Sequence, residues 1–141
     1  MDLMRGLAWL YCLMFFGVVA LDFIPAFMDA EGRLFGLFTL DFYDNSLHAA
    51  SGIWAGLAAW HSRSWSVFYF RLFGLLYFFD GVLGLFTGSG YLDFGIFIYG
   101  PLDLSLMIRF LANLPHLLIG GFAIYAGFVL SKREVGPGSP A

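Results

Sequence analysis

The sequence carries very little charge. Only 12% of its 141 residues are Asp, Glu, Lys or Arg, whereas an average soluble domain has about 25%. With 60% hydrophobic and 21% aromatic residues, this composition excludes a water-exposed globule and indicates an integral membrane protein whose main partner is the lipid bilayer. The single cysteine, Cys12, excludes an internal disulfide. The seven Lys and Arg form no basic stripe, so the net charge of -3 gives no indication of nucleic acid binding.

The sequence also lacks the motifs of the common enzyme classes. It contains no hydrolase, kinase or phosphate-loop pattern and no zinc-binding spacing of Cys and His. The stretch "GSG" (88–90) follows no strand and indicates a turn. The sequence therefore favours a protein that is not an enzyme.

Most of the chain consists of four apolar runs. They cover residues 6–24, 45–60, 67–87 and 114–130. At roughly 20 residues per membrane helix, they predict an all-α integral membrane four-helix bundle that occupies residues 1–130. The first run is longer than the apolar core of a signal peptide and no Ala-x-Ala site follows it, so we expect an uncleaved helix.

Two connecting segments are not simple polar loops. Residues 32–44 and 93–113 mix apolar residues with Asp and Arg, and we expect them at the membrane surface. Pro101 is expected to start a short amphipathic helix there. The Gly-, Pro- and Ser-rich residues 131–141 predict a disordered tail.

Basic residues gather on one side of the predicted membrane. If the four helices alternate in direction, one side carries five of the seven Lys and Arg, and the other carries most of the acidic residues. The basic side holds Arg5, Arg63, Arg71, Lys132 and Arg133. Because cytoplasmic loops are enriched in Lys and Arg, we expect a multi-pass protein of the cytoplasmic (plasma) membrane with both termini in the cytoplasm.

The two halves of the sequence resemble each other. Residues 5–18 ("RGLAWLYCLMFFGV") align with 71–84 ("RLFGLLYFFDGVLG"), and 45–60 ("NSLHAASGIWAGLAAW") align without a gap with 113–128 ("NLPHLLIGGFAIYAGF"). Identical pairs in the second alignment include Asn45/Asn113, His48/His116, Gly52/Gly120, Ala55/Ala123 and Ala58/Ala126. The sequence therefore predicts two tandem helix hairpins, repeat one over about 5–60 and repeat two over about 71–130, in the parallel-repeat arrangement.

The stretches "GLFTLDFYDNSLHAASGIWAGLAAW" and "NLPHLLIGGFAIYAGF" resemble the bacterial family called domain of unknown function 4383. That family consists of small four-span membrane proteins with Asn-x-x-His-x-x-x-Gly at the heads of their second and fourth spans. The resemblance covers nearly all of residues 5–130 and implies the fold and a bacterial inner-membrane location, without a mechanism. More distantly, the sequence is similar to DoxX-like four-helix membrane proteins. It departs from the family pattern in inserting "PLDLSLMIRF" before the second Asn and in placing Asp80 inside the third span.

The repeated Asn-x-x-His motif has a structural interpretation. Asn45 and Asn113 precede apolar runs, and Asn is a favoured N-cap residue because its side-chain oxygen accepts a free backbone N–H, which stabilises a helix by about 1 kcal/mol. His48 and His116 then fall three residues into each helix, where an imidazole nitrogen can accept the N–H of the cap.

The same motif also has a ligand-binding interpretation. Small residues follow each histidine on the same helix face and allow close approach of membrane helices. They are Gly52, Ala55, Gly120 and Ala123. We expect the second and fourth helices to pack together, which brings His48 and His116 close at the outer end. Two facing imidazoles can bind a haem iron or a divalent metal ion, with Asp44 or Asp41 as an additional carboxylate. No cofactor is the leading expectation, and haem or a divalent metal is the alternative.

Asp80 is the only charged residue within an apolar run at mid-membrane depth. It follows Arg71 by nine residues, about 13 Å along a helix. Intramembrane ionisable residues are costly and indicate function, so Asp80 is either a proton-relay carboxylate or a neutral acid that donates a hydrogen bond, for example to Tyr77. We expect no opposite charge at the same depth, which leaves Arg109 as the nearest candidate partner.

Three functions are compatible with these features. The first is a non-enzymatic structural or accessory membrane protein, acting as a homo-oligomer or within a larger membrane complex. The second is a haem- or metal-binding protein that uses His48 and His116. The third is a small proton-linked transporter that uses Asp80. We expect the first, because the chain is small, aromatic and without a catalytic set of residues.

Overall fold

Most of the described chain is helical. A computed structural model describes residues 2–133, and within them the only extended pairing consists of isolated β-bridges made by Leu34 with Met28 and Phe38. The long helices are α1 (Leu3–Asp22), α2 (Phe42–His61), α3 (Arg63–Thr87) and α5 (Leu106–Tyr125). The last of these continues through the π-helical η2 (Ala126–Leu130) into α6 (Ser131–Arg133). Two short helices, η1 (Pro25–Phe27) and α4 (Gly95–Ile98), lie in the loops.

Three helices of the described residues are long and apolar enough to cross a membrane. They are α1, α3 and the continuous helix Leu106–Arg133. Helix α2 has a similar length, but its first half carries Asp44, Asn45, Ser46 and His48, which lower its hydropathy. These apolar helices indicate a membrane protein, as the composition predicted.

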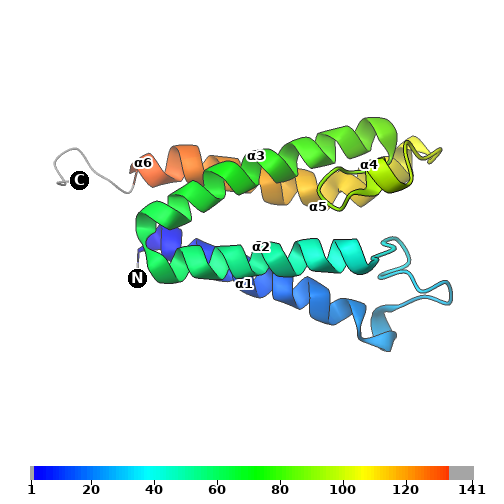
Figure 1. Ribbon diagram of the computed structural model, residues 1–141, viewed down its shortest axis with the longest axis horizontal. Helices are drawn as coiled ribbons and strands as arrows, with labels where there is room; N and C mark the ends of the chain where they lie inside the picture. Colours follow the sequence, from blue (N-terminus) through cyan, green and yellow to red (C-terminus); the bar gives the residue numbers. More distant parts are fainter. Residues whose placement is uncertain (1, 134–141) are drawn as a thin grey trace.

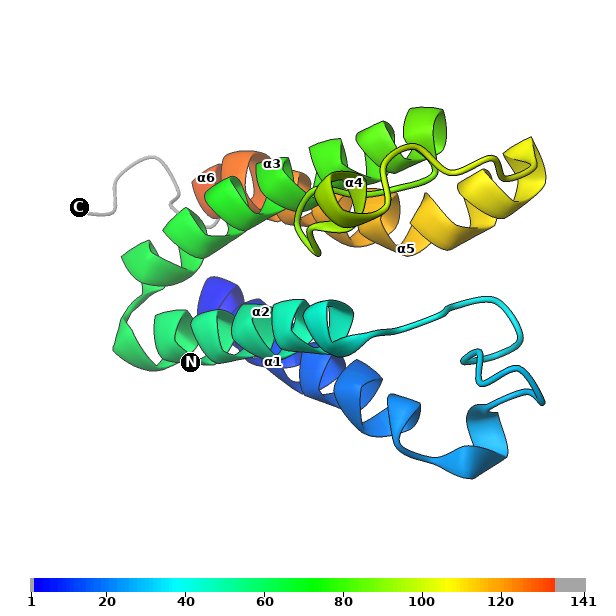
Figure 2. The same ribbon diagram turned by 45° about the vertical axis from the view of Figure 1, so that its right-hand side comes forward.

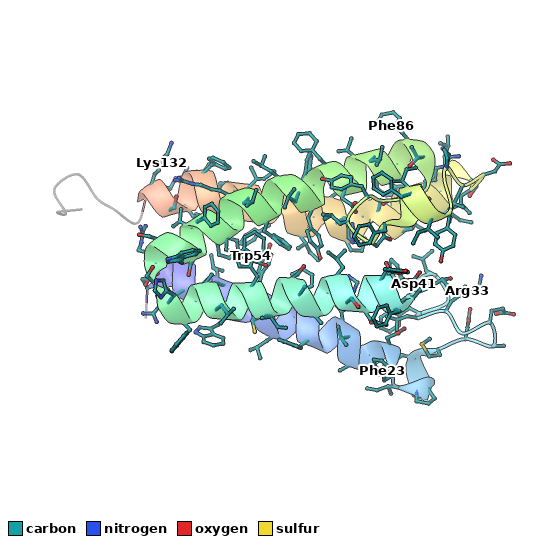
Figure 3. All side chains as sticks on the ribbon, viewed as in Figure 1. Phe23, Arg33, Asp41, Trp54, Phe86 and Lys132 are labelled. Atoms are coloured by element: carbon teal, nitrogen blue, oxygen red, sulfur yellow. The ribbon has the colours of Figure 1, made fainter. Side chains whose placement is uncertain are left out.

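The long helices are arranged as two pairs (Figures 1 and 2). Helix α1 packs along α2, and α3 packs along α5. The N-terminus, α6 and the turn from α2 to α3 gather at one end, which we call the Ser62 end (Figure 1). Residues 23–41 and the loop of residues 88–105 extend toward the opposite end, which we call the loop end. Arg33 and Asp41 lie at the loop end and Lys132 at the Ser62 end (Figure 3).

Side-chain caps fix the helix boundaries. Asp41 caps α2, because its side chain accepts the backbone N–H groups of Tyr43 and Asp44. Ser105 caps α5 by accepting the N–H of Ile108. At the end of α3, Gly88 takes the left-handed conformation (φ 79°) that glycine adopts without a steric penalty.

These caps correct the predicted boundaries of the connecting segments. The fourth long helix begins at Leu106, so residues 106–113 belong to it and not to a surface segment. Pro101 starts no helix, because the chain from 101 to 105 is irregular until Ser105 provides a cap. At the C-terminus, residues 131–133 are helical, and the remainder of the predicted tail lies outside the described residues.

Glycines bring the helices of each pair into close contact. A Cβ added at Gly74 would lie 2.6 Å from the backbone nitrogen of Ile124 on α5, and one added at Gly120 would meet the backbone nitrogen of Phe78 on α3. In the first pair, Gly52 faces α1, where an added Cβ would lie 3.2 Å from the Cβ of Phe15. The prediction that small residues join the second and fourth helices is therefore wrong, since these faces contact the neighbouring helix of the same pair.

Aromatic side chains of α1 and α3 pack between the two pairs. The ring of Tyr11 packs edge-to-face on Phe70 and Phe73, with centroids 5.1 and 5.7 Å apart. The ring of Phe15 contacts Phe73 and Tyr77 at 5.5 and 5.6 Å. All five side chains are buried, so this aromatic core occupies the space between the pairs and keeps α2 and α5 apart.

Two arginines make equivalent hydrogen bonds near the Ser62 end. The Nε of Arg5 donates to the carbonyl of Ala59 at 2.6 Å, and the Nε of Arg71 donates to the carbonyl of Gly127 at 2.8 Å. The sequence alignment of the two halves pairs Arg5 with Arg71 and Ala59 with Gly127. Each arginine therefore joins the first helix of a pair to the second at the same aligned position.

Two tyrosines make a second equivalent set of contacts, this time between the pairs. The hydroxyl of Tyr11 donates to the carbonyl of Ile119 on α5 at 2.8 Å. The hydroxyl of Tyr77 shares a 2.8 Å hydrogen bond with Ser51 on α2. Tyr11 aligns with Tyr77, and Ser51 with Ile119, so each tyrosine reaches from its own pair to the same aligned position of the other.

Candidate functional site

The most buried charged side chain is that of Asp80 on α3, which is 1% exposed. Its Oδ1 accepts the backbone N–H groups of Tyr91 and Leu92 at 2.6 and 2.9 Å, and its Oδ2 lies 2.6 Å from Nδ1 of His116 on α5. The left-handed Gly88 turns the chain back along α3, which brings residues 91 and 92 over the carboxylate. Asp80 thus joins α3, α5 and the loop of residues 88–105.

This arrangement corrects the predicted surroundings of Asp80. Sequence reasoning did not identify His116, whose Nδ1 lies within hydrogen-bonding distance of the carboxylate. Arg109 is not the partner, because its guanidinium donates to the backbone carbonyls of Phe86 and Leu102. The two backbone N–H groups were also missed, since nothing in residue type identifies an amide that will face a carboxylate.

The two predicted histidines belong to one row of contacting rings. The imidazole of His48 stacks on Phe15 with centroids 5.9 Å apart, Phe15 contacts Tyr77, and Tyr77 contacts His116 at 5.0 Å. His116 is oriented by Asp80, whereas Nδ1 of His48 is buried without a hydrogen-bond partner. The structure therefore places both histidines beside the aromatic core, each against a different ring.

The Asn residues of the repeated motif are not helix caps. Asn45 is the fourth residue of α2, because Asp41 caps that helix, and its Nδ2 donates to Asp22 of α1 at 2.7 Å. Asn113 is the eighth residue of α5, and its Nδ2 donates to the carbonyl of Arg109 at 2.8 Å. The capping prediction was wrong because Asp41 and Ser105, which also have strong N-cap preference, stand earlier in the chain.

Asp44, a candidate metal ligand, completes the cap of α2. Its side chain accepts the backbone N–H of Asp41 at 2.9 Å, while Asp41 accepts the N–H of Asp44, which forms a reciprocal capping box. Across residues 2–133, no three His, Cys, Asp or Glu side chains come together in a group that could hold a metal ion.

Asp41 also links the two loops. Tyr99 donates its hydroxyl to the second carboxylate oxygen of Asp41 at 3.2 Å, and this hydrogen bond raises the pKa of Tyr99. Partial burial opposes ionisation of Asp41, but the backbone N–H groups of Asp44 and Tyr43 outweigh it and hold the pKa of Asp41 below its ordinary value. The loop of residues 88–105 is therefore attached to the start of α2 as well as to α3.

A small pocket of about 160 Å³ opens between α2 and α3. Trp54 lies between these two helices (Figure 3), and Leu92 of the loop also lines the pocket. The other lining side chains are mostly apolar, apart from the hydrogen-bonded hydroxyls of Ser51 and Tyr77. The pocket lies next to the row of rings without including either histidine in its lining.

The fold and the site define a helical membrane protein with a buried carboxylate–histidine pair. A family model described as "Domain of unknown function (DUF4383)" matches residues 5–129. The chain therefore belongs to this family, as its repeated Asn-x-x-His motif predicted. Neither a curated protein nor a solved structure matches the chain.

Proposed function

We propose that this protein is a non-enzymatic structural or accessory protein of the plasma membrane, working within a homo-oligomer or a larger membrane complex. The observation that carries the proposal is the use of Asp80. Both of its oxygens are engaged in joining parts of the chain: Oδ1 holds the loop through Tyr91 and Leu92, and Oδ2 holds α5 through His116. Asp80, which carried the strongest sequence indication of a chemical role, thus holds α3, α5 and the loop together.

Other buried or half-buried polar side chains serve the same purpose. Arg5 and Arg71 each join the two helices of a pair by a hydrogen bond. Tyr11 and Tyr77 join one pair to the other in the same way. Hydrogen bonds between membrane helices contribute a modest but real stabilisation, about 0.6 kcal/mol each on average. A chain that uses its few polar groups in this way is suited to present a stable apolar surface to neighbouring proteins.

We further infer a four-helix bundle of two tandem hairpins with both termini in the cytoplasm. The aligned hydrogen bonds of the two arginines and the two tyrosines support the repeat. The concentration of Lys and Arg near the Ser62 end supports the orientation, because cytoplasmic segments are enriched in these residues. Exposed aromatic side chains such as Phe23 and Phe86, which are 73% and 76% exposed and point away from the helices (Figure 3), suit contact with lipid or with a partner helix.

Crosslinking in native membranes, followed by native mass spectrometry in mild detergent, tests the accessory role. We expect a defined assembly larger than one chain. Proton flux is measured in parallel in vesicles that contain the wild type or Asp80→Asn. A monomer whose proton flux disappears in Asp80→Asn would refute the accessory role and establish the transporter.

The second candidate is a haem- or metal-binding protein, supported by the hydrogen bond between His116 and Asp80. Metal-binding histidines commonly donate one ring nitrogen to a carboxylate, which orients the other toward the metal. Protein purified from native membranes should then show a visible absorption band or stoichiometric metal that is lost when His48 and His116 are both changed to Gln. A colourless and metal-free protein that folds normally would dismiss this candidate.

A further inference from the structure

Three side-chain polar atoms of α1 and α2 are buried without a hydrogen-bond partner. They are Oδ1 of Asp22, Oδ1 of Asn45 and Nδ1 of His48. His48 as a whole is 9% exposed, so its unpaired nitrogen has little access to solvent. Buried polar atoms without partners are rare in folded proteins, and each one calls for an explanation such as an unseen ion.

These atoms come from adjoining positions on α1 and α2. Asp22 ends α1, and its Oδ2 accepts the Nδ2 of Asn45 at 2.7 Å, which brings the free oxygens of both groups into the same region. His48 follows Asn45 by three residues, so the two side chains lie on one face of α2, one turn apart. The imidazole rests on Phe15, two turns before Asp22 on α1. The oxygens of Asp22 and Asn45 therefore lie together, and the imidazole lies deeper in the same seam between α1 and α2.

The unpaired atoms are of a kind that a cation satisfies. A carboxylate oxygen and an amide oxygen can only accept, and an imidazole nitrogen accepts when it is unprotonated. Oxygen donors suit Mn²⁺, imidazole suits Fe²⁺, Ni²⁺ and Zn²⁺, and mixed oxygen and nitrogen sets fall between them. The carboxylate of Asp22 supplies a negative charge that a bound cation would balance.

We propose that Asp22, Asn45 and His48 bind one divalent first-row transition metal ion, with water molecules completing its coordination. The third ligand is the amide oxygen of Asn45, so the site is not a group of three His, Cys, Asp or Glu side chains, of which the described residues contain none. The site lies within the first hairpin and does not require His116. It is independent of the accessory role, which concerns the assembly of the protein and not its ions.

Manganese binding to the full-length protein in detergent micelles tests the site. Protein stripped with a chelator is dialysed against Mn²⁺, and bound metal is measured by elemental analysis and by electron paramagnetic resonance. We expect one ion per chain, with magnetic coupling to a single ¹⁴N nucleus. Asp22→Asn and His48→Gln should each weaken binding at least tenfold. His61→Gln removes an imidazole at the far end of α2 and should change nothing.

The outcomes separate this site from the alternatives. Absence of bound Mn²⁺ in the wild type, or binding equal in wild type and His48→Gln, would overturn the proposal and leave water as the partner of these atoms. Loss of the ion in His116→Gln as well would assign it to a shared bis-histidine site and also overturn the proposal. If a variant fails to fold, the ¹⁴N coupling in the wild type still decides, because its absence excludes an imidazole ligand.

Discussion

Replacing Asp80 with Ala should release the loop of residues 88–105 from the helices. The change leaves the backbone N–H groups of Tyr91 and Leu92 and the Nδ1 of His116 without their acceptor. An orphaned buried polar group costs about 1–3 kcal/mol. Because the same carboxylate serves three groups, we expect a total of about 3–6 kcal/mol. Asp80→Asn keeps an oxygen for the two amides and should cost about 1 kcal/mol.

Hydrogen exchange in lipid nanodiscs, resolved to single amides, measures this effect where it arises. A local destabilisation of about 3 kcal/mol accelerates exchange by about two powers of ten. We expect this acceleration for the amides of Tyr91 and Leu92 in Asp80→Ala and a much smaller one in Asp80→Asn. Asp103→Ala, which removes an exposed carboxylate from the same loop, is the matched control. Equal exchange at these two amides in Asp80→Ala and Asp103→Ala would refute the role assigned to Asp80.

Three further predictions concern the helix contacts and the loops. Gly120→Ala should destabilise the protein by about 1–3 kcal/mol through overpacking against the backbone of α3. Gly121→Ala is the control, because its Cβ would have ordinary contacts at 3.8 Å, and it should be neutral or slightly stabilising. Thermal unfolding of the two variants measures the difference. Tyr77→Phe should cost about 1 kcal/mol by removing a single hydrogen bond to α2, and an unchanged unfolding temperature would contradict this contact. The pKa of Tyr99 should lie above 10 because Asp41 accepts a hydrogen bond from its hydroxyl, so the stabilisation is present below pH 10 and is lost as the pH rises through the raised pKa. Tyrosinate absorbance, corrected with Tyr99→Phe, should show the pKa falling toward 10 in Asp41→Asn.

Composition and periodic apolar runs were sufficient to predict the class of protein. Membrane helices are specified by the average hydropathy of about 20 residues. An error of a few residues in a helix boundary therefore does not change the predicted class of protein. Helix boundaries depend on single capping residues, and several candidates competed. At α2 the choice of Asn45 over Asp41 as the cap shifted the expected start by four residues, because both residue types cap helices well.

The surroundings of the site could not be predicted in the same way. Contact between Asp80 and His116 depends on the rotation of α3 and α5 about their own axes, and these residues are 36 positions apart. The prediction that the second and fourth helices pack together assumed that glycines mark the contact between hairpins. In the structure, Gly120 serves the contact within a hairpin, and large rings such as Phe73 fill the space between hairpins. Small residues indicate close packing without identifying the partner helix.

A single residue, Ser62, connects α2 with α3. Its N–H donates to the carbonyl of Ala58 and its hydroxyl accepts the N–H of Trp65, so one residue ends one helix and begins the next. Neighbouring Cα atoms are about 3.8 Å apart, so the adjoining ends of the two helices cannot separate. A tilt of one helix pair against the other therefore has its pivot near Ser62. Since α2 has 20 residues and is about 30 Å long, a tilt of about 5° displaces its far end by roughly 2.6 Å. Such a tilt produces its largest displacement at Asp22, Asn45 and the loop that Asp80 holds, and almost none at the Ser62 end.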